Sequence, residues 1–430
     1  MAAPSTADRL RAKLKMRVAE FLNGTAPSSQ SPATLRALKD HLGQVLNTLS
    51  VDEHRVLCVS RAGEAERFID ELMSETLGLG PLDALLNDPT VSEIMVNGPS
   101  EVFVERDGRL QRTEVRFRDA NHLMVTIEQM LNPVGLAVNE SNPWCDASLP
   151  DGSRINVIIP PLVMNGPVVT IRRTLRRWAM QEVVELSSLS PEAAEFLEGC
   201  VRARVNMVFS GGTSTGKTTL VAILSSAIPQ EERVITIENV PELELPERAH
   251  WIRLVAKISN LEGRGEIPLR TLVKNAMRMR PDRIILGEAR GGEALDVVQA
   301  MHSGHDGFMT VLHANSPLAA LERLQTLMQM SGLEIPPASC GIQIASAIDL
   351  IVHLARFVDG SRRIAAISQV LGYASAGGFA VEELFTLDAA AGFSEAGRLQ
   401  GQCGYTGVTP KFLKKFRLNN VQVPAWVTIA

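Results

Sequence analysis

Apolar residues recur at helical spacing along the first part of the chain. Leu10, Leu14, Val18 and Leu22 fall on one stripe, and such a stripe is typical of an amphipathic helix that packs through one face. The segments LRALKDHLGQVLNTL and AERFIDELMSETL show a similar spacing, and the Pro- and Ser-rich stretch TAPSSQSPAT before them indicates a short linker. We therefore predict an N-terminal helical module over residues 1–76.

Short β-rich runs bounded by Gly and Pro replace this pattern from residue 77 onward. One helical segment, HLMVTIEQML, lies among them. This mixture predicts a smaller α/β domain of PAS-like type over residues 77–180. The β-rich runs are EIMVN, EVFVERDG, RLQRTEVRF, RINVIIPPL and VVTIRR.

The rest of the chain alternates apolar β-rich runs with helical stretches. Its strands read VNMVFS, RVITIE, RIILGE and FMTVLH, and runs of this kind are typical of parallel strands that are buried on both faces. Before the first of them, Ser190 suits the N-cap of a helix and Pro191 its first position. We therefore predict an α/β domain with a parallel-rich sheet over residues 181–430.

Composition limits the class of protein. The 430 residues suffice for two or three domains with cores of their own. Hydrophobic residues make up 45% and charged residues 21%, and no segment approaches the roughly 18 consecutive apolar residues of a transmembrane helix. The first residues also lack the apolar region of a secretory signal. We expect a cytoplasmic protein without direct membrane insertion.

Charge and cysteine usage narrow the choice of partners. The formal net charge of −5 gives no overall attraction for DNA or RNA, so nucleic acid is disfavoured as a substrate. The cysteines include no CxxC pair, which suggests neither a disulfide framework nor a zinc site. They are Cys58, Cys145, Cys200, Cys340 and Cys403.

The segment GGTSTGKT carries the strongest functional signal. It has the pattern GxxxxGK[ST], and it stands between the predicted strand VNMVFS and the helical stretch TTLVAILSSA. Glycines let backbone N–H groups converge on a phosphate, the lysine adds a charge for the β and γ phosphates, and Thr218 offers a hydroxyl to Mg²⁺. These residues predict a site for ATP and Mg²⁺ in a RecA-like P-loop ATPase domain. They are Gly211, Gly212, Thr213, Ser214, Thr215, Gly216, Lys217, Thr218 and Thr219.

Hydrolysis also requires a carboxylate that orients the attacking water and helps to hold Mg²⁺. Glu288 ends the apolar run RIILGE, although Gly287 stands where an aspartate is usual in a Walker B strand. Glu238 ends the run RVITIE, and Glu242 follows one helical turn later. We predict Glu288 as the main candidate, with Mg²⁺ contacted through water. Glu238 and Glu242 remain open alternatives for poising water, and Glu244 fits a charged loop equally well.

Two histidines lie in the segment SGHDGFMTVLHANSP. His305 is in a Gly-rich loop, and His313 ends the predicted strand FMTVL. A polar residue at a strand end can sense the loss of the γ-phosphate, whereas no third ligand at metal spacing accompanies the pair. A hydrogen-bonded core histidine is the alternative for one of them.

Taken together, these motifs are more specific than a P-loop. From about residue 70 onward, the chain resembles the CpaF-like ATPases of tight-adherence pili, within the type II/type IV secretion ATPase superfamily. The resemblance rests on LGLGPLDALLNDPTVSEIMVNGP, SLPDGSRINVIIPP, GPVVTIRR, GGTSTGKTT, ITIENVPEL, MRPDRIILGEARG and GHDGFMTVLHANSP.

The resemblance implies roles for individual residues. Glu288 belongs to the Walker B segment, in which Gly287 matches the family's own form. ITIENVPEL matches the Asp box, which assigns an acidic role to Glu238 and Glu242, with Asn239 where the family typically has aspartate. SGHDGFMTVLHA matches the His box, so His305 and His313 become sensors of the γ-phosphate or of the subunit interface. Arginines that reach the nucleotide correspond to Arg154 and Arg172, with Arg173 as the neighbouring alternative.

The resemblance also implies a machine. Such enzymes form homohexameric rings that close over ATP and reopen after hydrolysis. They transmit this motion to polytopic platform proteins at the cytoplasmic face of the inner membrane, and so drive assembly, and in some members retraction, of a pilus. Three alternatives stay open: a type II or type IV secretion ATPase that moves protein or DNA, a P-loop module that regulates with little turnover, and a nucleic-acid motor.

Overall fold

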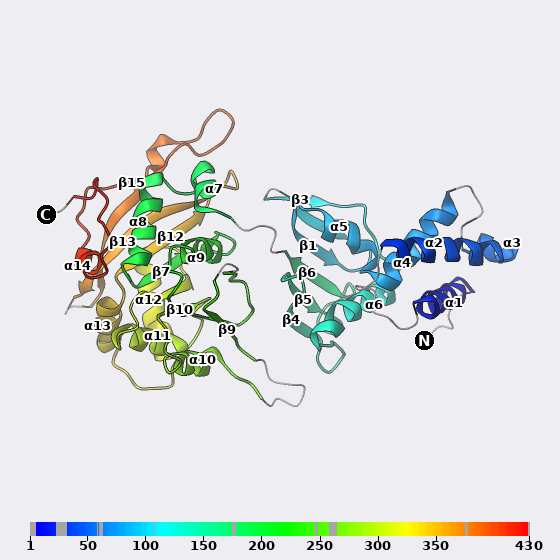
Figure 1. Cartoon of the computed structure of the whole chain (residues 1–430), viewed down its shortest axis with the longest axis horizontal. Helices are drawn as coiled ribbons and strands as arrows, with labels where there is room; N and C mark the ends of the chain where they lie inside the picture. The colour runs from blue at the N-terminus through cyan, green and yellow to red at the C-terminus, as the bar shows by residue number, and fades with distance from the viewer. Residues whose placement is uncertain are drawn as a thin grey trace. The chain divides into compact units, whose positions relative to one another are not determined.

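The computed structural model describes residues 6–22, 32–57, 59, 63–106, 108–173, 178–245, 248–257, 265–374 and 377–428. The chain divides into two compact units, Met1–Leu175 and Arg176–Ala430 (Figure 1). The predicted boundaries after residues 76 and 180 stay predictions.

The first unit begins with α-helices that share a hydrophobic core. The apolar stripe of the first helix is buried in this core, with Val18 fully enclosed against Leu38 and Leu42 of the second helix and Leu72 of the fourth. This confirms the amphipathic pattern of Leu10, Leu14, Val18 and Leu22. The helices are α1 (Thr6–Phe21), α2 (Pro32–Asn47), α3 (Val51–Val56) and α4 (Glu64–Leu77).

A six-stranded antiparallel sheet follows in the same unit, with strand order β3-β2-β1-β6-β5-β4. Its buried residues form one core with the helix α6 (Ala120–Leu131), which Asp119 caps. The strands and the helix match the predicted runs, except for β4, which was not predicted. The PAS-like type of this domain remains a prediction. The elements are η2 (Gly80–Leu82), α5 (Asp83–Asn87), β1 (Val91–Asn97), β2 (Val102–Arg106), β3 (Arg109–Arg112), η3 (Asn132–Val134), β4 (Trp144–Ser148), β5 (Arg154–Ile158) and β6 (Val168–Arg172).

A buried carboxylate joins the helices of the first unit to its sheet domain. Glu75 of α4 is 7% exposed. It lies 3.0 Å from the Lys15 ammonium and 3.2 Å from the Arg11 guanidinium, both on α1. It also pairs with Arg118, just before α6, and lies 3.6 Å from His122 on α6. Because a buried carboxylate needs such partners, this cluster fixes how the elements of the unit pack.

The second unit contains a nine-stranded mixed sheet with the order β15-β14-β13-β12-β7-β11-β10-β8-β9. The six strands from β12 to β9 in this order are parallel, whereas β13, β14 and β15 extend the sheet antiparallel. The predicted runs form β7, β8, β10 and β11, so the parallel-rich sheet is confirmed. The strands are β7 (Met207–Gly211), β8 (Val234–Glu238), β9 (Trp251–Val255), β10 (Arg283–Leu286), β11 (Met309–His313), β12 (Leu350–Arg356), β13 (Arg362–Tyr373), β14 (Phe379–Leu387) and β15 (Cys403–Tyr405).

Helices cover both faces of this sheet. Residues of α8 and α9 share a core with one face, and residues of α10 to α13 share a second core with the other. Ser190 caps α8 by accepting a hydrogen bond from Ala193 N–H, and Pro191 is the first helical residue, as predicted. The helices are α7 (Met180–Glu185), α8 (Pro191–Arg202), α9 (Lys217–Ser225), α10 (Leu269–Ala276), α11 (Glu293–His302), α12 (Pro317–Gln329), α13 (Pro337–Ala347), η4 (Ala389–Ala391) and α14 (Leu413–Leu418).

Candidate nucleotide-binding site

The segment GGTSTGKT connects the buried strand β7 to the helix α9, as the motif predicts. Gly216 has φ of +93° and directly precedes α9. Gly211 has no room for a side chain, because a Cβ atom there would overlap the Leu354 carbonyl oxygen and approach Thr215 Oγ1 to 2.8 Å. Both glycines are therefore required by the turn that places backbone N–H groups at the beginning of α9.

Lys217 lies back across the loop that precedes it. Its ammonium donates to the carbonyl oxygens of Gly211, at 3.1 Å, and Gly212, at 2.5 Å. Burial lowers the pKa of Lys217, while the negative charges of Glu288 and Glu242 oppose this shift. The lysine is thus held at the loop and next to two of the predicted carboxylates. Thr218 is half-buried and Thr219 exposed at the same helix end.

Glu288 and His313 meet beside the P-loop. Glu288 follows β10, and its Oε1 lies 3.3 Å from His313 Nε2, while its Oε2 accepts from Arg290 at 2.7 Å. His313 ends β11 directly opposite Gly211 of β7. Burial, followed by the nearby charge of Lys217, lowers the pKa of His313 despite the opposing charge of Glu288. His313 and Arg290 therefore hold the Glu288 carboxyl group at the edge of the sheet at which the P-loop begins.

The packing of Glu238 explains why Gly287 has no carboxylate side chain. A Cβ atom at Gly287 would lie 2.8 Å from Glu238 Cγ, and this separation is too short for any side chain to occupy without a shift. The strands β8 and β10 are adjacent and parallel, so the two residues meet at the same sheet edge. Any side chain at position 287 therefore requires Glu238 to shift.

Glu238 itself is buried and holds the segment that follows it. Its Oε1 accepts from the backbone N–H groups of Glu242 and Leu243, each at 2.9 Å. Burial raises the pKa of Glu238 to about 7, although these two donors act in the opposite direction. Asn239 is exposed, and Glu242 and Glu244 are half-buried. The negative charge of Glu242 acts on Lys217, whereas nothing in the geometry assigns Glu244 a place in the site.

The two predicted histidines lie at different ends of the sheet. His305 precedes β11, whereas His313 ends it. Because the sheet is parallel here, the two residues are at opposite edges. His305 Nδ1 lies 3.2 Å from Ser303 Oγ and 3.3 Å from the Ala300 carbonyl oxygen. The structure does not bring His305 to the P-loop of its own chain. A role at a subunit interface therefore remains the prediction for His305.

The predicted arginines belong to the first unit. Arg154 of β5 and Arg172 of β6 are directly opposite each other in the antiparallel pair, and therefore share one face of that sheet. Arg172 also lies 3.5 Å from Glu93 of β1. Arg173 instead donates to the carbonyl oxygens of Asp88 and Val91. Arg173 thus has a structural function, and the pair Arg154 and Arg172 remains the candidate.

One buried histidine next to the P-loop is not anticipated by motif reasoning. His353 of β12 is 9% exposed, and its Nδ1 lies 2.9 Å from Ser210 Oγ, the residue before Gly211. Burial lowers its pKa. The signal in the sequence is a single polar residue inside the apolar run LIVHLA. The contact itself depends on β12 pairing with β7, which no local pattern predicts.

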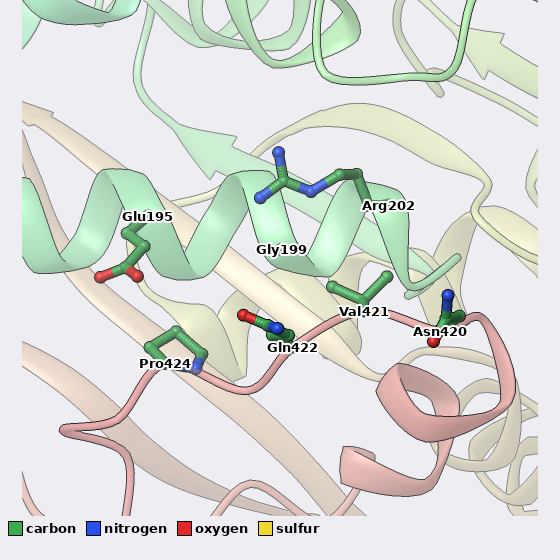
Figure 2. A pocket seen from close by; sticks show the side chains of 7 residues that line it. All are labelled: Glu195, Gly199, Arg202, Asn420, Val421, Gln422 and Pro424. Atoms are coloured by element: carbon green, nitrogen blue, oxygen red, sulfur yellow. The ribbon is translucent and has the colours of Figure 1, made fainter.

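A pocket in the second unit lies away from these residues. It measures about 260 Å³ and is lined by α8 and the C-terminal segment, including Glu195, Arg202, Gln422 and Pro424 (Figure 2). Trp426 donates to Glu195 at 2.8 Å near this pocket. None of the residues predicted to bind nucleotide lines it. The pocket is therefore distinct from the P-loop site.

The part of the chain that the structure describes also bears on metal sites, free thiols and membrane-spanning helices. No group of three or more His, Cys, Asp or Glu residues in that part could hold a metal ion. Cys145, Cys200, Cys340 and Cys403 are buried free thiols, and Cys58 lies outside the described residues. Among the described helices, none has the length and hydropathy to cross a membrane.

The residues of the P-loop site fit a nucleotide with Mg²⁺. The P-loop contains glycine both at Gly211 and at Gly216, which directly precedes α9, and the absence of a side chain at these positions suits close approach of phosphate oxygens to the backbone. Thr218 supplies a hydroxyl at this helix end and Glu288 supplies a carboxylate, both of which are ligand types that Mg²⁺ prefers. The arrangement can therefore bind a triphosphate, and it can orient a water molecule through Glu288.

The sequence is similar to a known protein family. It matches the family model described as "Type II/IV secretion system protein" over residues 75–391. A protein of Mycobacterium tuberculosis whose name relates it to conjugal transfer is 33% identical over 306 aligned positions, which cover 69% of this chain and 86% of that protein. The type IV secretion system protein VirB11 of Brucella suis is 34% identical over 326 positions, which cover 69% and 90%.

Two solved ATPase structures are also similar to this chain. The VirB11 ATPase of the Brucella suis type IV secretion system, in complex with sulphate, is 30% identical, covers 67% of this chain and 95% of that chain, and has a TM-score of 0.37. The ATPase DotB of Legionella pneumophila is 20% identical, with 69% and 80% coverage and a TM-score of 0.46.

Proposed function

This chain belongs to the type II/IV secretion system protein family, and from this premise we propose that it is the motor of a tight-adherence pilus machine of the CpaF-like type. It is an ATPase, with a P-loop and the carboxylate Glu288 beside it. What we propose beyond this activity is the machine that the ATPase drives. Its support is the set of motifs shared with CpaF-like proteins, from DGSRINV to GHDGFMTVLHANSP.

The observation that carries the catalytic proposal is the pair Glu288 and His313. Glu288 is partly exposed, is fixed by His313 and Arg290, and is close enough for its negative charge to oppose the lowering of the Lys217 pKa by burial. A fixed carboxylate can orient water toward the γ-phosphate and accept its proton. Lys217 stabilises charge on the β and γ phosphates. Thr218 and, through water, Glu288 would hold Mg²⁺, which would neutralise part of the phosphate charge.

Glu242 and the buried Glu238 support this arrangement in different ways. Glu238 holds the backbone of Glu242 and Leu243, so it positions the segment that carries Glu242 near Lys217. Arg154 and Arg172 form a second source of positive charge on one sheet face. In the proposal, these arginines approach the nucleotide in the assembled ring and neutralise charge that develops at the γ-phosphate.

The proposed assembly is a homohexameric ring at the cytoplasmic face of the inner membrane. Its closing around ATP and reopening after hydrolysis would move polytopic platform proteins and drive pilus assembly, with retraction as a second mode. His305, which is remote from the P-loop of its own chain, is then available as a sensor at a subunit interface. No nucleic acid takes part in this scheme.

A type IV secretion ATPase that moves protein or DNA fits the similarities equally well. The relatives named above belong, by name, to conjugal transfer and type IV secretion. This second function keeps the same site and differs only in what the ring drives. An experiment that distinguishes the two functions must therefore change the partner that is added and leave the ATPase itself unchanged.

Stimulation of ATP turnover distinguishes the two functions. Phosphate release by the purified ring is measured with vesicles that contain the polytopic platform protein of the same pilus system, with empty vesicles, and with DNA. We expect the platform vesicles to raise the rate of phosphate release several-fold, because in the proposal the platform protein is the partner to which hydrolysis is coupled, and DNA to leave the rate unchanged. Lys217→Ala provides the background rate. Stimulation by DNA, without an effect of the platform protein, would favour the type IV secretion function.

A further inference from the structure

The hairpin formed by β12 and β13 lies beside the P-loop. Strand β12 is the parallel neighbour of β7, with Leu354 directly opposite Gly211. Arg356 ends β12, Arg362 begins β13, and these two residues are paired across the hairpin. Two arginines therefore lie at the carboxyl end of β12, at the same edge of the sheet at which the P-loop begins.

Arg362 lies next to the beginning of α9. Its Cδ is 3.9 Å from the position that a Cβ atom would take at Gly216. Ile364, two residues further along β13, shares a buried core with Leu220 of α9. Because alternate residues of a strand lie on one face, Arg362 is on the same face of the sheet as α9. Its guanidinium is thus within side-chain reach of the helix end that receives phosphates.

The turn that carries Arg362 is firmly held. Asp359 accepts from Ser361 N–H at 2.9 Å, from Ser361 Oγ at 2.6 Å and from Leu399 N–H at 2.9 Å. The next residue, Arg363, is buried and donates to the carbonyl oxygens of Gly401, at 2.6 Å, and Leu399. These contacts fix the backbone on both sides of Arg362, so the position of its Cα beside the P-loop is set by the fold.

The sheet order places Arg362 on the opposite flank of the P-loop from Glu288. Strand β7 lies between β12 on one side and β11, followed by β10, on the other. Glu288 and His313 belong to the β10 and β11 side. Since Glu288 acts where the γ-phosphate is cleaved, a cation on the other flank faces the part of the nucleotide that is not cleaved.

We propose that Arg362 is a further nucleotide-binding residue, which contacts the α-phosphate and nucleoside end that ADP and ATP have in common. This rests on the proposed ATPase site and adds a contact that no motif identifies. A guanidinium can bind phosphate oxygens in a bidentate manner and stack on a purine ring. Arg356 is directly opposite Arg362, so both arginines lie at the same end of the hairpin.

The proposal predicts a loss of binding and no loss of chemistry. In Arg362→Ala, the Kd values for ADP and for a non-hydrolysable ATP analogue should both rise by about tenfold or more, and by similar factors, because the lost contact is charge-assisted and common to both ligands. KM for ATP should rise, while kcat at saturating ATP stays within about twofold, as for any contact made equally in the ground and transition states. Arg362→Lys should retain part of the affinity.

The matched control is Arg202→Ala. This change also removes one exposed arginine from the second unit, but Arg202 ends α8 at the pocket lined by the C-terminal segment. Its Kd values should equal those of the wild type. Circular dichroism and thermal melting establish folding, and Arg362→Gln, which keeps the length of a polar side chain, decides the question if the alanine variant does not fold.

Two results would overturn the proposal. Unchanged affinity for both ligands in a folded variant removes Arg362 from the site. A fall in kcat with unchanged KM and Kd means that Arg362 acts on the cleaved phosphate or between subunits. Because ADP binding is measured directly, neither result depends on whether platform proteins stimulate the ring. If the proposal of a pilus motor is wrong, the ADP measurement still tests the role of Arg362.

Discussion

The two strand-end carboxylates Glu238 and Glu288 have different surroundings, and these surroundings separate their functions. Glu238 is 3% exposed and accepts two backbone hydrogen bonds. Glu288 is partly exposed and paired with Arg290 and His313. A carboxylate that can meet both water and a cation is suited to catalysis, whereas the enclosed Glu238 is suited to hold a loop.

The raised pKa of Glu238 predicts a specific dependence of stability on pH. Its pKa is about 7 in the folded protein and about 4.3 in an unfolded chain. Between these values the folded state binds the proton and the unfolded state does not, so the contribution of Glu238 to stability falls as pH rises through this window. Relative to Glu238→Gln, the wild type should therefore lose up to about 3 kcal/mol of unfolding free energy between pH 5 and pH 8.

Urea denaturation of both proteins at several pH values measures this difference. Subtracting the variant from the wild type removes the contributions of all other titrating groups, because glutamine keeps the oxygen that accepts the two backbone hydrogen bonds. Parallel stability curves for the two proteins would show that Glu238 does not titrate in this window.

The part of the site that the sequence predicts is the part that is local along the chain. The P-loop and Glu288 are recognised because strand, turn and helix residues are contiguous there. His353 and Arg362 are different, since their places depend on β12 pairing with β7 and on the hairpin that follows. Likewise, the blocked position at Gly287 depends on the neighbouring strand β8.

At the scale of elements, the sequence pattern predicts β7, β8, β10 and β11 but not β9 or β12 to β15, of which only β9 and β15 lie at the borders of the sheet. β7, β8, β10 and β11 are short runs that are almost fully buried, and so their sequences are nearly continuously apolar. β9 alternates between partly buried and exposed residues, and β15 has three residues. Edge strands have one free side and weaker patterns, which accounts for β9 and β15. The interior strands β12, β13 and β14 are also outside the predicted runs.

The close approach of β8 and β10 at Gly287 gives an element-scale prediction. Gly287→Ala introduces a Cβ atom 2.8 Å from Glu238 Cγ, and one side chain must move. We expect a loss of about 1–3 kcal/mol of unfolding free energy, as is typical of overpacking. Gly372→Ala in β13 is the control, because a Cβ atom there meets nothing within 4 Å. Equal stability of the two variants, measured by denaturant unfolding, would contradict this account of Gly287.

At the scale of the whole molecule, the two units carry complementary chemistry. The second unit contains the P-loop and Glu288, and the first unit contains the pair Arg154 and Arg172 on one sheet face. Sequence reasoning assigns these arginines to the nucleotide only through family resemblance, since no local pattern distinguishes them from arginines in surface ion pairs. Their approach to the nucleotide in an assembled ring is part of the proposal, and ATP hydrolysis is the activity that tests it.

The most direct test of the central claim is steady-state phosphate release with Mg-ATP by the purified protein, whose mass in solution is measured alongside. Wild type and Glu288→Gln are compared, together with their affinity for ADP. The account predicts a hexamer in which the substitution lowers kcat by at least about 100-fold and changes ADP affinity little, because a group that orients and deprotonates water contributes on this scale. Equal turnover in the two proteins, or loss of ADP binding in the variant, would contradict the assignment of Glu288 as the catalytic carboxylate.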